Sequence, residues 1–145
     1  LFDSNIKDAI KQVKIPYRKN GGYGGTDQSG ENGLSVKAFL LSGYEVGFTT
    51  SDSSYFPVDG AKLDYFTASS GGNVKRIANF NGSPYGWWLR SPYGGNALSV
   101  WYIDTSGRNN RLSSYTSYGV RPAIILPSDM IVTDDMLVTD DMLAA

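Results

Sequence analysis

The sequence contains neither histidine nor cysteine. Histidine is the most common general base and metal ligand in proteins, and cysteine supplies thiolate nucleophiles, disulfides and zinc ligands. Their absence excludes Ser-His-Asp and Cys-His catalysis and any zinc site that needs thiolates. The sequence also has no apolar run of about 18 residues, the length that predicts a membrane-spanning helix. We therefore expect neither these catalytic mechanisms nor insertion into a membrane.

Charge of either sign is sparse. Acidic and basic residues make up 19% of the chain, and the formal net charge is −1. No run of lysine or arginine forms a phosphate-binding stripe, which argues against nucleic acid as a partner. The acids are unevenly placed, because a group of them with no basic residue follows Pro127. These acids are Asp129, Asp134, Asp135, Asp140 and Asp141.

Glycine and tyrosine are abundant, with 17 and 10 residues, which is typical of a turn-rich chain with many amphipathic side chains. The length of 145 residues fits one domain. We place this domain at residues 1–127 and interpret 128–145 as an acidic tail. The tail contains a repeat, because Ile-Val-Thr-Asp-Asp-Met at 131–136 is followed by Leu-Val-Thr-Asp-Asp-Met at 137–142. Since the chain begins at Leu1 without methionine, we interpret it as the C-terminal part of a longer protein.

Hydrophobic periodicity predicts short elements. Ile6, Ile10 and Val13 recur at helical spacing, so residues 4–14 are expected to form an amphipathic helix that ends before Pro16. Apolar or alternating runs predict strands at residues 36–42, 87–90, 100–105, 112–115 and 119–126. The last four of these strands are expected to form one compact antiparallel sheet.

Three charged residues, Glu45, Arg90 and Arg121, lie between apolar neighbours and are expected to be buried. An unpaired buried charge is costly, so mutual pairing is the favoured solution, with an arginine fork holding a carboxylate or strand-end carbonyl groups. A ligand-binding arginine is the alternative. We expect replacement of Glu45 by glutamine to reduce stability first and binding only second.

No metal site or cofactor is expected, because the acids show neither calcium-loop nor general acid–base spacing. We interpret Asp52, Asp59 and Asp64 as solvated loop acids. The alternative is a structural calcium ion held by loop carboxylates, asparagines and backbone carbonyl groups.

The segment 93–118 has the composition of a recognition surface. Tyrosine and arginine are frequent contact residues in interfaces, and the serines, glycines and asparagines between them adapt their hydrogen bonding. Strand alternation indicates that Trp101 and Ile103 face the core, whereas Tyr102 and Asp104 face the other way. The alternative interpretation is a soluble, turn-rich sheet edge without a partner.

Several short motifs stand out along the chain. They are Trp-Trp-Leu-Arg-Ser-Pro at 87–92, Val-Trp-Tyr-Ile-Asp at 100–104, Ser-Gly at 106–107 and Tyr-Gly-Val-Arg-Pro-Ala at 118–123, with Ile-Pro-Tyr at 15–17, Phe-Leu-Leu-Ser at 39–42 and Glu-Val at 45–46 upstream. Together they resemble a family of domains of unknown function that occurs in phage tail proteins and in surface proteins of gut bacteria. The resemblance covers roughly residues 5–127.

That family is similar to the C-type-lectin-like fold in its formylglycine-generating-enzyme branch, and to the variable proteins of diversity-generating retroelements. The resemblance implies an α+β, C-type-lectin-like fold with short antiparallel strands, one or two helices and long Gly/Ser-rich loops. It implies the scaffold without the catalysis, because the enzymes of that branch depend on cysteines. Calcium-dependent sugar binding is not implied either, because the Glu-Pro-Asn and Trp-Asn-Asp motifs of sugar-binding lectins are missing.

In those variable proteins the binding positions lie between a start that contains Arg and Trp and a fixed end strand, an interval that corresponds here to residues 93–117. The ligand-binding residues that the resemblance implies are Tyr93, Asn96, Leu98, Ser99, Tyr102, Asp104, Arg108, Asn109, Asn110, Arg111, Ser113, Tyr115 and Ser117.

We therefore expect a non-enzymatic receptor-binding domain of a phage tail or tail-fibre protein, located in the virion or at an extracellular surface. Its partner would be a host-surface protein or glycan, and display as a homo-oligomer would add avidity. Two alternatives stay open. One is a structural virion module that contacts other virion subunits through residues 128–145, and the other is a cell-surface adhesin domain of a bacterium.

Overall fold

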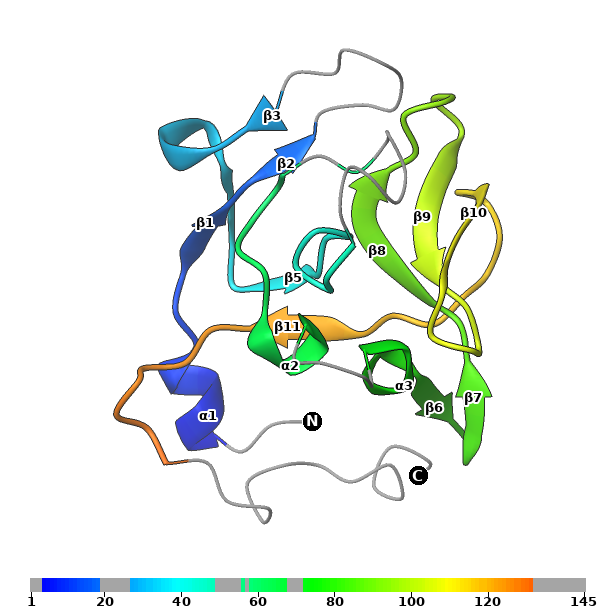
Figure 1. Cartoon of the computed structure of the whole chain (residues 1–145). Coiled ribbons are helices and arrows are strands. Elements are labelled where there is room, and N and C mark those ends of the chain that lie inside the picture. Colours follow the sequence, from blue (N-terminus) through cyan, green and yellow to red (C-terminus); the bar gives the residue numbers. More distant parts are fainter. Residues whose placement is uncertain (1–3, 19–26, 49–55, 57, 68–71, 132–145) are drawn as a thin grey trace.

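The computed structural model describes residues 4–18, 27–48, 56, 58–67 and 72–131 (Figure 1). The helices in these ranges are short: α1 (Ser4–Ala9), α2 (Asp64–Thr67), α3 (Gly72–Arg76) and a single 3-10 turn, η1 (Gly30–Asn32). The other regular elements are strands of two to six residues.

The longest strands form a three-stranded antiparallel sheet in the order β10–β9–β8. Its members are β8 (Trp87–Pro92), β9 (Ser99–Ile103) and β10 (Asn109–Ser113). Tyr102 in the central strand pairs with Trp88 on one side and with Asn110 on the other. The register of the β8–β9 pair shifts between Trp88 and Pro92.

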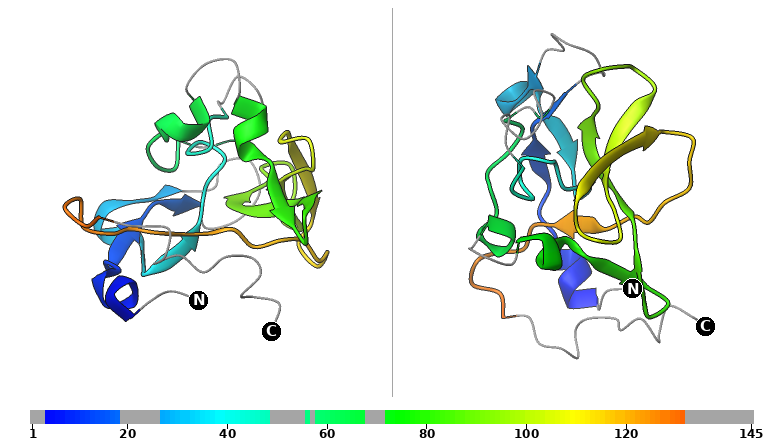
Figure 2. Two further views of the ribbon diagram at one scale, coloured as in Figure 1. Left: turned by 90° about the horizontal axis from the view of Figure 1, so that it is seen from below. Right: turned by 45° about the vertical axis from the view of Figure 1, so that its right-hand side comes forward.

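The other described strands associate in antiparallel pairs. The pairs are β1 (Val13–Ile15) with β4 (Leu34–Val36), β2 (Tyr17–Arg18) with β3 (Asp27–Gln28), β5 (Ala38–Leu40) with β11 (Pro122–Ile124), and β6 (Ala78–Phe80) with β7 (Ser83–Tyr85). The chain that follows β10 crosses the molecule through β11 toward α1, as Figures 1 and 2 show. There the Lys11 N–H donates to the Ile125 carbonyl at 2.9 Å. This segment therefore connects the main sheet to the N-terminal elements.

One face of β8 and β9 builds the hydrophobic core. Trp87 and Leu89 on β8 are buried together with Trp101 and Ile103 on β9, as the alternation of strand side chains requires. Phe56 stacks on Trp101 with ring centroids 4.3 Å apart. Large aromatic side chains contribute much of the buried area in such a small core. The inward orientation expected for Trp101 and Ile103 is confirmed.

The α+β, C-type-lectin-like fold that the resemblance implied is wrong for this chain. The described residues form mostly small antiparallel sheets with three short helices. The physical reason lies in the turn residues. Glycine, proline, serine and asparagine interrupt each hydrophobic run before a long helix or a broad sheet can form.

Other expected elements also differ. The helix expected over residues 4–14 is limited to α1, and Val13 instead begins β1, where it pairs with Val36. A partner strand distant in sequence here outweighs the helical spacing of the apolar residues. Residues 36–42 are divided between the partly exposed strands β4 and β5. Residues 119–126 contribute β11, which pairs with β5 and does not extend the sheet of β8, β9 and β10.

Candidate functional site

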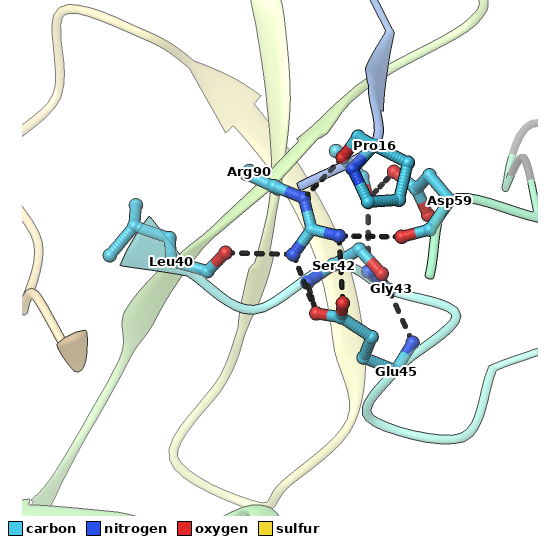
Figure 3. Close-up of polar contacts among 8 residues, drawn as sticks. Pro16, Leu40, Ser42, Gly43, Glu45, Asp59 and Arg90 are labelled. Atoms are coloured by element: carbon cyan, nitrogen blue, oxygen red, sulfur yellow. Dashed lines mark hydrogen bonds and ion pairs between the residues drawn. The ribbon is translucent and has the colours of Figure 1, made fainter. Parts of the chain in front are cut away.

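Arg90 on β8 is the centre of a buried polar network (Figure 3). Its Nε donates to the Pro16 carbonyl at 3.0 Å, and its Nη1 donates to the Leu40 carbonyl at 2.9 Å and to Glu45 Oε2 at 2.5 Å. Its Nη2 donates to Glu45 Oε1 at 2.8 Å and to the Asp59 carbonyl at 2.5 Å. Every N–H donor of the guanidinium group is therefore used. One side chain ties β8 to chain segments that precede it by 31 to 74 positions.

Glu45 also forms hydrogen bonds with Ser42, three residues before it in the chain. The Ser42 N–H donates to Glu45 Oε2 at 2.9 Å, and the Glu45 N–H donates to the Ser42 hydroxyl at 3.0 Å. The side chains of Arg90 and Glu45 are only 9% and 10% exposed, so their bidentate pair lies in a setting of low dielectric. The mutual pairing expected for Glu45 and Arg90 is present, whereas Arg121 does not take part in this network.

Gly60 leaves the space that the Glu45 carboxylate occupies. Its φ is +135°, and a Cβ at this position would overlap the Glu45 carboxylate. Gly60→Ala is therefore expected to lower the free energy of unfolding by about 1–3 kcal/mol, measured by urea denaturation. Gly82→Ala is the matched control, because Gly82 also has a positive φ, +75°, but its Cβ would meet no atom within 4 Å. Equal losses in the two variants would contradict this role of Gly60.

The residues expected to bind a ligand are divided between the two ends of the β9–β10 hairpin. Ser113 pairs with Ser99 at one end, and Asn109 pairs with Ile103 at the other. At or beside the first end lie Asn96, Leu98, Ser99, Ser113 and Tyr115. At or beside the second end lie Asp104, Arg108, Asn109 and Asn110. Strands of this length span roughly 15 Å. A small ligand at one end would therefore not reach the other.

Several of these residues support the sheet. Tyr93 and Tyr102 are buried. Asp104 Oδ1 accepts hydrogen bonds from the N–H and hydroxyl groups of Ser106 and from the Arg108 N–H, at 2.7–3.0 Å. This pattern closes the turn between β9 and β10. Burial acts to raise the pKa of Asp104, but these hydrogen bonds outweigh it and the net pKa is lowered. The carboxylate that holds the turn is thus ionised at neutral pH.

Tyr102 lies on the face of the sheet opposite the core, but other aromatic rings cover it. Its ring centroid is 5.8 Å from that of Trp88 and 4.6 Å from that of Tyr118. Burial and a hydrogen bond with Tyr118 raise the pKa of Tyr102 to about 12. Its small exposed area leaves Tyr102 little surface to offer a ligand.

Leu98 and Tyr115 expose large apolar surfaces at the first end of the hairpin, with exposed fractions of 69% and 85%. Their backbones lie close together, because the Ser114 N–H donates to the Leu98 carbonyl at 2.9 Å. The exposed Arg111 reaches over the Tyr93 ring, 4.6 Å from its centroid. We call Leu98, Arg111 and Tyr115 the hairpin-end surface.

A concave site that the sequence does not predict lies beside the β6–β7 pair. The cleft has a volume of about 700 Å³, and its lining includes Phe80, Tyr85, Tyr118 and Arg121. These residues meet because the chain at Gly119 forms a bridge with Trp87. The sequence shows that these aromatic residues are present, but their convergence depends on this pairing between distant segments.

A family model described as a domain of unknown function, DUF6273, matches residues 1–128. The chain belongs to the DUF6273 family. This membership agrees with the resemblance at its coarsest level, a family of domains of unknown function that covers nearly the whole body. It assigns no activity to the DUF6273 domain. Searches of curated proteins and of solved structures find no match.

Of the acids considered for calcium, Asp59 and Asp64 lie within the described residues. Asp52 lies outside the described residues, as do residues 132–145, which hold most of the acidic repeat. Asp64 begins α2, and Asp59 is only 1% exposed, so the expectation of a solvated Asp59 is wrong. It is buried because its carbonyl binds Arg90 and its carboxylate accepts the Ser91 hydroxyl at 3.2 Å.

Within the described ranges, no group of three acidic side chains could hold a metal ion. The helices of these ranges are also too short and polar to cross a membrane.

Proposed function

We propose that this DUF6273 domain is a non-catalytic binding module that recognises a protein or glycan at a host-cell surface through the hairpin-end surface. The observation that carries the proposal is the exposure of Leu98 and Tyr115 in neighbouring turns at one end of the β9–β10 hairpin. Exposed apolar side chains that adjoin an arginine are typical of protein interfaces.

The rigidity of the surroundings supports this role. Arg111 lies over Tyr93, which packs edge-on against the core residue Trp101 with ring centroids 5.3 Å apart. The Tyr93 N–H donates to the Ser99 carbonyl at 2.9 Å, which joins the two ends of the segment that contains Leu98. Contact residues on a fixed scaffold lose little conformational entropy on binding.

The biological setting that we propose is a phage tail or tail-fibre protein in the virion, with a bacterial cell surface as the partner. The motifs at 87–92, 100–104 and 118–123 support this setting through their resemblance to domains of phage tail proteins. Repetition of the domain in a homo-oligomer would strengthen weak individual contacts.

The double variant Leu98→Ala/Tyr115→Ala is expected to reduce binding of the fluorescently labelled protein to a panel of gut-bacterial cells by at least about ten-fold. The physical reason is the loss of two apolar contacts, each of which typically contributes on the order of 1 kcal/mol or more. Cell-bound fluorescence is measured by flow cytometry, and the melting temperature is measured in parallel.

Val74→Ala is the matched control, because Val74 is another exposed apolar residue and lies on α3. It is expected to leave cell binding unchanged. The proposal fails if the double variant binds a recognised strain as well as the parent protein does, or if the parent protein binds no strain in the panel.

A further inference from the structure

The cleft beside the β6–β7 pair contains an arginine, Arg121, with a buried nitrogen that no described residue hydrogen-bonds. Nη1 of Arg121 is buried and has no hydrogen-bond partner among the described residues. No described carboxylate forms an ion pair with Arg121 either. Its guanidinium carbon lies 5.1 Å from the centroid of the Trp87 ring and 5.7 Å from that of Phe66. Stacking on these rings offsets only part of the desolvation, and arginine cannot become neutral at physiological pH.

The unpaired charge indicates what would complete the site. Arg121 is partly buried, and a partly buried cation is most strongly compensated by an anion that can bind the guanidinium fork. Arg121 is the one ionised group among the residues that line the cleft, since the others are apolar or polar and uncharged at neutral pH. A single positive charge matches a single carboxylate better than a phosphate group, which carries nearly two negative charges.

Aromatic rings line the rest of the cleft. Phe80 is 62% exposed, and its ring lies 5.6 Å from that of Tyr85, which in turn lies 5.9 Å from that of Tyr118. Exposed aromatic rings in a row offer flat apolar faces to a ring-shaped ligand. The Asn79 amide and the tyrosine hydroxyl groups add hydrogen-bonding groups at the same place. This mixture suits a polyhydroxylated ring better than a purely apolar one.

We propose that this cleft binds an acidic sugar, a uronic acid unit, with its carboxylate at Arg121 and its ring against Phe80 and Tyr85. A volume of about 700 Å³ lies within the range of small-ligand sites and has room for a sugar ring. This site is separate from the hairpin-end surface. It would give the domain a preference for glycans that carry carboxylates, whatever the partner of that surface is.

The test compares two sugars that differ at one group, methyl β-D-glucuronide and methyl β-D-glucoside. Each is titrated into the full chain, and chemical shifts are followed by NMR. The glucuronide is expected to bind in the millimolar range or tighter and at least about ten-fold more tightly than the glucoside, with shifts at the β6–β7 pair and residues 118–121. Added salt is expected to weaken binding of the glucuronide and to leave binding of the glucoside unchanged.

Two variants examine the two parts of the cleft. Arg121→Gln is expected to remove the difference between the sugars. Phe80→Ala is expected to weaken the binding of both sugars by about three- to ten-fold. Because Phe80 is exposed, this variant keeps the test valid even if Arg121→Gln does not fold. Val74→Ala, at an exposed residue outside both the cleft and the hairpin-end surface, is the control and is expected to leave both affinities unchanged.

Several results would overturn the assignment. They are equal binding of the two sugars, absence of binding by both, and chemical shift changes confined to residues outside the cleft. Unchanged glucuronide binding by folded Arg121→Gln would show that this arginine only stacks on Trp87. Tighter binding of benzoate than of the glucuronide would exclude the sugar as the preferred ring.

Discussion

Arg90→Met is expected to lower the free energy of unfolding by about 3–5 kcal/mol, because the substitution leaves the Glu45 carboxylate buried without its cation. The carbonyl groups of Pro16, Leu40 and Asp59 lose their donor in the same variant, and each unsatisfied buried carbonyl adds a desolvation cost. Methionine keeps much of the aliphatic volume of arginine, so the loss reports mainly on the polar network. The measurement is urea denaturation at neutral pH.

Two controls make this result interpretable. Arg108→Met replaces an exposed arginine and is expected to change the free energy of unfolding by no more than about 0.5 kcal/mol. The double variant Arg90→Met/Glu45→Gln is expected to lose less than the sum of the two single variants, because it also removes the charge that Arg90→Met leaves unpaired. A loss for Arg90→Met as small as that for Arg108→Met would contradict the central role of Arg90.

The network of Arg90 shows how much the sequence can predict about buried charge. Local neighbours alone indicated that Glu45 and Arg90 would be buried, and the cost of an isolated charge indicated that they would pair. The same reasoning could not place Arg121, because its surroundings are two aromatic rings rather than a carboxylate. It also could not identify Asp59, since a loop acid becomes buried only when distant segments close over it.

The fold was harder to predict than its individual strands. Period-two alternation correctly identified Trp101 and Ile103 as the inward face of β9, because that pattern depends on neighbours within one strand. The pairing of β1 with β4 and of β5 with β11 depends on contacts between segments distant in sequence, which no local pattern encodes. The resemblance to a known fold did not supply this information, since short motifs can be shared by chains whose strands are arranged differently.

The candidate surface illustrates the same limit. The composition of residues 93–118 suggested contact residues, but it could not distinguish the exposed Tyr115 from the covered Tyr102. That difference arises from Trp88 and Tyr118, whose rings pack against the Tyr102 ring. Composition therefore predicts that a segment can bind, whereas packing decides which of its side chains are available.

Stability is expected to depend on pH through Asp59. Burial raises the pKa of Asp59 from 3.8 to about 6, although Arg90 and the hydroxyl groups of Ser42 and Ser91 act in the opposite direction. Between these two pH values the folded state holds a proton that the unfolded state has lost, so stability falls as pH rises from about 4 to about 6. Above this window the ionised Asp59 reduces the free energy of unfolding by about 3 kcal/mol, from roughly 1.4 kcal/mol per pKa unit.

Asp59→Asn is therefore expected to stabilise the domain at pH 7 by up to about 3 kcal/mol and to have little effect at pH 4, where the native aspartate is already protonated. Asparagine keeps an oxygen that can accept the Ser91 hydroxyl, and it removes the charge from a position where Oδ1 has no described partner. Urea denaturation at pH 4, 5, 6 and 7 measures the difference between variant and parent. Asp64→Asn, at an exposed aspartate, serves as the control and should show no such pH-dependent gain. An Asp59→Asn difference that stays constant across the four pH values would mean that packing, rather than the buried charge, controls stability at this position.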